Sequence, residues 1–157
     1  MQDVTKGEGE AAEVHPGQVR FVRDNVVPTL TVTLGRVYDA GLALKSIIDQ
    51  PRSLSQMANF RIAKLYETLL PFAQVVDKEK IALAQELGCE KVDEHNVSQG
   101  WQVPENKLEE YRTRLSKRCS ETIVLTVRPL TLTMLGGDLP NGIEAREFAM
   151  LGEFVTE

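Results

Sequence analysis

The 157-residue sequence is poor in the residues that build metal centres and disulfide frameworks, with only two cysteines and two histidines. Two cysteines are too few for the disulfide framework on which small secreted domains depend. No apolar run approaches the ~20 residues that a membrane-spanning helix requires, and residues 1–14 lack the apolar core of a signal peptide. These absences indicate a soluble protein of the cytoplasmic type.

Motifs for nucleotide binding and for nucleophilic catalysis are also missing. No glycines stand in the patterns G-x-x-x-x-G-K-[ST] or G-x-G-x-x-G, and no serine stands in G-x-S-x-G. Cys119 is expected on the apolar face of a helix, where a free cysteine packs as a small hydrophobic residue. Cys89 follows a helix C-terminus, whose negative end opposes thiolate formation. We therefore expect no catalytic residue and no cofactor.

The remaining candidates for chemistry each have a plainer interpretation. Cys89, Asp93, Glu94 and His95 lie within seven residues, but a zinc site needs three or four converging ligands. The alternative is a solvated acidic loop. A formal net charge of −5 argues against a general nucleic-acid binder, although it leaves room for a local basic patch. Such a patch would be formed by Arg112, Arg114, Lys117 and Arg118, and the alternative is helical pairing of these bases with Glu110 or Glu121.

The amino-acid composition is that of a globular protein, with 42% hydrophobic and 26% charged residues. The length fits one domain, which we place at residues 19–157. Residues 1–18 are rich in glycine, glutamate and alanine, and such a segment buries too little apolar surface to offset its ordering entropy. We expect a flexible N-terminal arm there, followed by a short strand at Val19–Val22.

Alternating side chains predict a half-buried strand at Leu30–Leu34, and Thr33 is the expected N-cap of a helix over residues 34–49. Pro51 ends this helix. The sequence Leu-Thr-Val-Thr at residues 30–33 is echoed by Leu-Thr-Leu-Thr at residues 130–133. The echo has two interpretations. It indicates either a duplicated unit whose two copies offer equivalent docking surfaces, or two strands of one antiparallel sheet whose threonines face the solvent.

The strongest pattern is a long amphipathic helix from Ser53 to Leu87, ended by Gly88 as its C-cap. Pro71 is expected to kink this helix or to split it into two collinear pieces. An apolar seam with alternating three- and four-residue spacing runs along the helix and requires another helix against it. The seam residues are Ile62, Leu65, Leu69, Phe72, Val76 and, one heptad further, Leu83.

A third helix is expected from Pro104 to Glu121, returning antiparallel along the Phe72–Leu87 half of the long helix. The polar residues 89–103 form the connection, as a loop or a return strand. Strands are expected at residues 123–127 and 130–134, and a helix of three turns or fewer within residues 143–154. The predicted fold is α+β, a long antiparallel helical hairpin kinked near Pro71 with a small antiparallel β-sheet and short flanking helices.

The return helix is too short to cover the N-terminal half of the seam, so that half must pack on the first helix or on another chain. A protein partner, in a homo-oligomer or a larger assembly, is the leading expectation for function. The expected interface residues are Leu54, Met57, Phe60, Tyr66, Leu30, Val32, Leu130 and Leu132.

The order of segments resembles small accessory proteins of tailed bacteriophages. It runs from IIDQPRS through FRIAKLYETLLPFAQVVDKEKIALAQELG, then PENKLEEYRTRLSKR and IVLTVRPLTL, to a short terminal helix. The resemblance covers residues 33–155 and carries over no catalytic residue. It implies a non-enzymatic virion or assembly protein, in the virion or the host cytoplasm, with the hairpin as a rigid spacer. The alternatives are an inhibitor of a host protein and a small enzyme without a recognisable motif.

Overall fold

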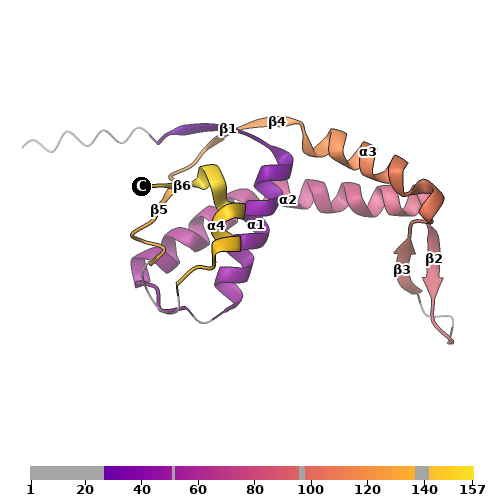
Figure 1. Ribbon diagram of the computed structural model, residues 1–157, viewed down its shortest axis with the longest axis horizontal. Helices are drawn as coiled ribbons and strands as arrows, with labels where there is room; N and C mark the ends of the chain where they lie inside the picture. Colours follow the sequence, from indigo (N-terminus) through magenta and orange to yellow (C-terminus); the bar gives the residue numbers. More distant parts are fainter. Residues whose placement is uncertain (1–26, 51, 96–97, 137–141) are drawn as a thin grey trace, which may run out of the picture.

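A computed structural model describes residues 27–50, 52–95, 98–136 and 142–157 (Figure 1). The expected N-terminal arm (1–18) and the strand expected at Val19–Val22 lie outside these residues. The described elements are mainly helical with short strands, which confirms the predicted α+β class. A body of short elements lies at one end, and two antiparallel helices extend from it as a stalk (Figure 1).

The longest element is α2 (Gln56–Leu87), whose 32 residues span about 48 Å at 1.5 Å per residue. The Ser55 side chain caps its first turn by accepting a 3.1 Å hydrogen bond from the Ala58 N–H. Gly88 is the C-cap, as predicted, and donates its N–H to the Ala84 carbonyl at 2.9 Å. Pro71 lies within α2, so the helix is not split there into two pieces.

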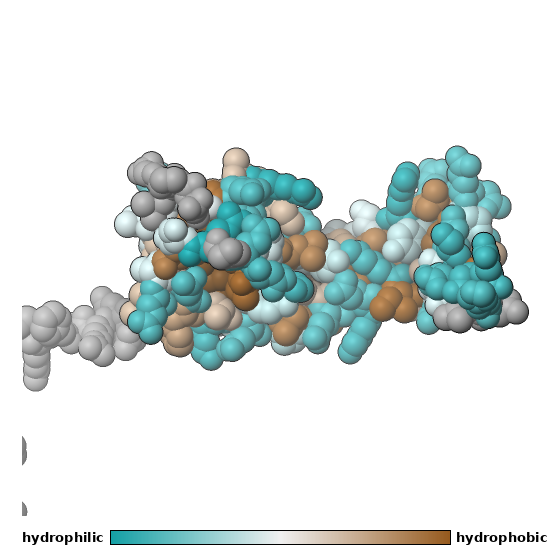
Figure 2. Space-filling model, turned by 90° about the horizontal axis from the view of Figure 1, so that it is seen from below, coloured by the Kyte–Doolittle hydropathy of each residue, from teal (hydrophilic) through white to brown (hydrophobic). Residues whose placement is uncertain are grey.

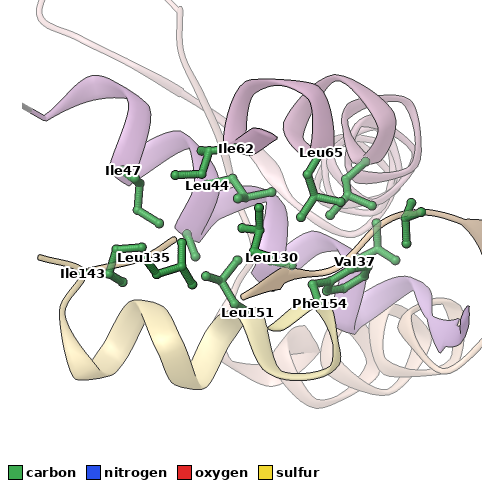
Figure 3. Close-up of a cluster of buried hydrophobic side chains, with 14 of the residues drawn as sticks. Val37, Leu44, Ile47, Ile62, Leu65, Leu130, Leu135, Ile143, Leu151 and Phe154 are labelled. Carbon is green, nitrogen blue, oxygen red and sulfur yellow. The ribbon is translucent and has the colours of Figure 1, made fainter. Parts of the chain in front are cut away.

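The first helix, α1 (Leu34–Asp49), covers the N-terminal half of α2. Thr33 caps it by accepting a 3.3 Å hydrogen bond from the Arg36 N–H, as predicted. Of the two candidates for covering this half of the seam, the chain's own first helix is therefore the one observed. The two helices share one core, which includes Val37, Leu44, Ile47, Ile62, Leu65 and Leu69 (Figure 3).

The stalk consists of the C-terminal half of α2 and the returning helix α3 (Leu108–Cys119), which begins after the 3₁₀ turn η1 (Glu105–Lys107). The connection between them is an antiparallel β-hairpin of β2 (Cys89–Val92) and β3 (Ser98–Gln102), which projects from the far end of the stalk (Figure 1). The helical hairpin is confirmed. The packing of α3 on α2 is shallow, because α3 has no fully buried residue.

The strands form three separate pairs. β1 (Thr29–Thr33) and β4 (Thr122–Thr126) pair antiparallel, whereas β5 (Leu130–Thr131) and β6 (Val155–Thr156) pair in parallel. The two echoed segments therefore do not share one antiparallel sheet, and that interpretation was wrong. Residues 130–131 pair with the C-terminal segment instead.

The C-terminal helix α4 (Ala145–Leu151) and the 3₁₀ turn η2 (Gly152–Phe154) close the body against α1. This is the short helix expected at the end of the chain. Its Leu151 and the following Phe154 are fully buried and lie on the same core as α1 (Figure 3). The body is thus built from segments at both ends of the described chain.

Candidate functional site

A groove of about 390 Å³ lies between the N-terminal half of α2 and the chain that leaves β4. We call it the α2 groove. From α2 it is lined by Met57, Phe60, Arg61, Lys64, Leu65 and Thr68, and from the end of β4 and the next residues by Thr126, Val127 and Arg128.

Helical geometry explains why these α2 side chains share a face. Positions 57, 60, 61, 64 and 68 follow the i, i+3, i+4 spacing of one stripe. This stripe is turned by roughly 120° from the core-facing stripe of Ala58, Ile62 and Leu69, given 3.6 residues per turn. Met57 and Phe60 are therefore carried outside the core, and they are 59% and 61% exposed.

The floor of the groove is apolar and its rim is basic. Leu65 is only 4% exposed and Val127 5%, so both belong to the core below. Arg61 makes no hydrogen bond or ion pair with any described residue, and the Lys64 ammonium meets one exposed carboxylate, Glu67, at 3.0 Å. With Arg128, three cationic side chains border the groove in a chain whose net charge is −5. The groove therefore favours an anionic ligand with apolar side chains.

The groove continues onto the outer face of the β1–β4 pair. Successive side chains of a strand point to opposite faces, so Thr126 in the groove and Val124 lie on one face. Val124 is 65% exposed, and it lies opposite Thr31 in the register. The residues of this face are threonines and one valine, with no charge: Thr29, Thr31, Thr33, Thr122, Val124 and Thr126.

The interface residues expected from the sequence separate into two groups. Met57 and Phe60 line the groove, and Leu132 is 43% exposed. The others contact the core. Val32 and Leu130 are 5% and 1% exposed and cannot form a partner surface, because the alternation of their strands turns them inward. The three that pack half-buried against the core are Leu30, Leu54 and Tyr66.

The basic rim was not predicted as part of this site. Arg61 and Lys64 belong to the long helix that the sequence predicts. Nothing in the helical pattern indicates that Arg128 lies beside them. In the basic cluster expected on α3, Arg114 and Arg118 pair with carboxylates, including Glu110 and Glu121. Arg114 forms a bidentate pair with Glu86 of α2 at 2.6 and 2.7 Å, and this hydrogen-bonded pair holds the pKa of Glu86 below its usual value. It joins the two helices of the stalk.

The other candidates for chemistry do not converge into a site. Among the described residues, no three histidine, cysteine, aspartate or glutamate side chains are grouped to hold a metal ion. The Asp93 carboxylate instead accepts hydrogen bonds from the His95 N–H at 2.9 Å and from Gln99 Nε2 at 3.1 Å. Partial burial raises the pKa of the Cys119 thiol, which works against its use as a nucleophile.

One buried polar cluster joins the α1–α2 connection to α4. The Arg52 guanidinium donates to Glu147 at 2.8 and 3.0 Å, and their side chains are 9% and 6% exposed. The Ser46 hydroxyl donates to the same carboxylate at 2.9 Å, and Arg52 also donates to the Gly142 carbonyl at 2.8 Å. The partners in this cluster come from three parts of the body, so the cluster holds α1, the α1–α2 connection and α4 together. Its polar groups are buried and are not open to a substrate.

No family model matches the sequence, and no curated protein and no solved structure matches it either. Within the described ranges, none of the helices combines the length and the apolar character needed to cross a membrane. Apolar side chains are nevertheless exposed in several places, as separate brown patches on both the body and the stalk (Figure 2). In the α2 groove, the exposed apolar side chains of Met57 and Phe60 and three cationic side chains surround a hollow.

Proposed function

We propose that this protein is a non-enzymatic interaction module that docks an acidic, partly apolar segment of a partner protein in the α2 groove. The observation that carries the proposal is the pair Met57 and Phe60, each about three-fifths exposed, beside an Arg61 that has no described partner. Exposed apolar patches rimmed by polar residues typically mark sites of protein interaction. An aromatic anchor next to an arginine is the composition of an interface hot spot.

The size of the groove favours a short segment over a globular surface. A hollow of about 390 Å³ accommodates a few side chains, at the lower end of the range for small-ligand pockets. A partner helix or extended segment would place one or two apolar side chains on Leu65 and its carboxylates against Arg61 and Lys64. The uncharged outer face of β1 and β4 would extend the contact without repelling an acidic ligand.

The resemblance to accessory proteins of tailed phages supports an assembly setting for this interaction. In that setting the body would hold the partner segment, and the stalk would act as a rigid spacer that keeps the β2–β3 hairpin at a distance from it. The proposal thus keeps the helical hairpin as a spacer and, of the interface residues expected from the sequence, it keeps Met57 and Phe60 of α2.

The test is a selection of random peptides displayed against the immobilised full chain, followed by fluorescence polarisation with the best peptide. Enriched peptides should carry aspartate or glutamate next to aromatic or aliphatic residues. Phenylalanine buries about 150–250 Å², of which 61% is still exposed here. At about 25 cal/mol per Å², Phe60→Ser removes roughly 2–4 kcal/mol of binding, and the peptide Kd should rise at least ~30-fold.

Ile81→Ser is the matched control, because Ile81 lies on the same helix, is 56% exposed and is not among the groove residues. Its Kd should equal that of the unmodified protein. Arg61→Glu should weaken binding and remove much of its salt dependence. Peptides without acidic residues, or binding that survives Phe60→Ser, would contradict the proposal.

A further inference from the structure

The part of the chain that precedes the described residues leaves from the edge of the α2 groove. The Val127 N–H donates to the Pro28 carbonyl at 3.2 Å, which continues the β1–β4 pairing by one residue. Val127 itself lines the groove. Residues 1–26 are therefore tethered beside a hollow that has cationic side chains on its rim.

The sequence of that tethered segment complements the groove in charge. Residues 1–14 contain four acidic side chains and one basic side chain, a formal net charge of −3. They also contain the branched apolar residues Val4 and Val14. Residues 15–26 hold two arginines and one aspartate, so the acidic character belongs to the distal part alone.

We propose that residues 1–14, the acidic segment, occupy the α2 groove of their own chain. A valine of the segment would lie on Leu65 between Met57 and Phe60, and the carboxylates of Glu10 and Glu13 would face Arg61 and Lys64. The inference rests on the proposed function in using the same groove. It adds that a partner segment must displace the chain's own.

The tether is long enough and makes the intramolecular arrangement the favoured one. Thirteen peptide links join Val14 to Val27, with a maximum reach of about 45 Å. Covalent attachment through so short a tether places the segment at an effective concentration in the millimolar range. A second copy of the chain at micromolar concentration would compete poorly with it.

The test uses the full chain with a photo-reactive benzophenone amino acid in place of Val14. An equal mixture of unlabelled and isotopically heavy protein is irradiated and digested, and cross-linked peptides are identified by mass spectrometry. The expected cross-links join the acidic segment to residues 57–68 and contain only light–light or heavy–heavy pairs. Mixed pairs would assign the groove to a second copy, and cross-links confined to other regions would remove the groove as the binding site. Either result overturns the proposal.

A charge exchange tests the chemistry of the contact. Arg61→Glu with Lys64→Glu should reduce the cross-link yield at least about fivefold, because like charges then face each other. Adding Glu8→Lys, Glu10→Lys and Glu13→Lys to the same chain should restore most of the yield. Arg112→Glu with Lys117→Glu, at exposed positions of α3, is the control and should leave the yield unchanged. A yield that ignores the charges at positions 61 and 64 counts against the proposal.

The outcome is separable from that of the proposed function. If selected peptides bind the groove but Val14 cross-links elsewhere, the interaction function stands and the intramolecular contact is refuted. If Val14 cross-links to residues 57–68 but no peptide binds even after the acidic segment is neutralised, the contact stands and the proposed function fails.

Discussion

Removal of the Glu147 carboxylate is the most informative perturbation of the fold. The carboxylate accepts two hydrogen bonds from Arg52 at 2.8 and 3.0 Å and one from the Ser46 hydroxyl at 2.9 Å. It also accepts the Glu144 N–H at 2.9 Å, which closes the capping box of α4. Glu147→Ala therefore leaves the Arg52 guanidinium, 9% exposed, without its counter-charge and removes one of the two hydrogen bonds of the capping box.

The expected cost follows from the burial of the pair. Breaking a buried ion pair by removing one partner costs about 3–5 kcal/mol, because an uncompensated charge is left behind. A domain of this length loses about 2–4 °C of melting temperature per kcal/mol, so Tm should decrease by roughly 6–20 °C. Thermal and urea denaturation followed by far-UV circular dichroism measures both quantities.

A double variant separates the charge from the packing. Arg52→Met with Glu147→Leu replaces the pair by apolar side chains of similar length, and it should be more stable than Glu147→Ala because no buried charge remains. Glu86→Gln at the exposed Arg114 pair is the control and should change Tm far less, since solvent screens that pair. If Glu147→Ala costs under about 1 kcal/mol, the cluster does not hold α4 in place and the reasoning fails.

Three further predictions concern the C-terminal turn and the cysteines. Gly152 has φ +45°, and an added Cβ would lie 1.8 Å from Arg36 Nη2. Gly152→Ala should therefore displace Arg36 and lower stability by about 1–3 kcal/mol in urea denaturation. The exposed Cys89 should be alkylated before Cys119, whose thiol pKa is raised by burial, and mass spectrometry of partly labelled native protein measures the order. A hydrogen bond from its own backbone N–H and the neighbouring Arg36 lower the pKa of Glu153 below its ordinary value of 4.5. Glu153 thus stabilises the fold above that pH, and this contribution is lost as the pH falls through the lowered pKa. Glu153→Gln should flatten the acid side of a plot of stability against pH.

The helices could be predicted from the sequence because their signals are local. Thr33 and Ser55 cap α1 and α2, and Gly88 ends α2 one residue after Leu87. The spacing of the seam also identified Ile62, Leu65 and Leu69 of the core and the buried Val76 and Leu83, whereas Phe72 is only partly buried. Each of these features depends on residues within one or two turns of each other, so the pattern alone contained them.

The strand pairs and the groove depend on contacts between distant residues. The β2–β3 hairpin has few apolar residues, and its strands are exposed or half-buried. No alternation of apolar and polar residues therefore predicts it. The parallel pair of β5 and β6 joins two-residue strands that lie 25 positions apart at Leu130 and Val155. Arg128 lines the groove beside α2 residues that lie 60 or more positions earlier in the chain. A periodic pattern carries no information about such a long-range contact.

Substitution of the exposed apolar residues of α2 should affect binding without affecting stability. The core stripe of α2 is complete without Met57 and Phe60, and glutamine has a helix propensity similar to that of methionine. Met57→Gln with Phe60→Gln should therefore change the free energy of unfolding by no more than about 0.5 kcal/mol per site. The same variant should lose the peptide binding proposed for the groove. A large loss of stability on urea denaturation would mean that these side chains support the fold itself. Their exposure would then be no argument for a partner.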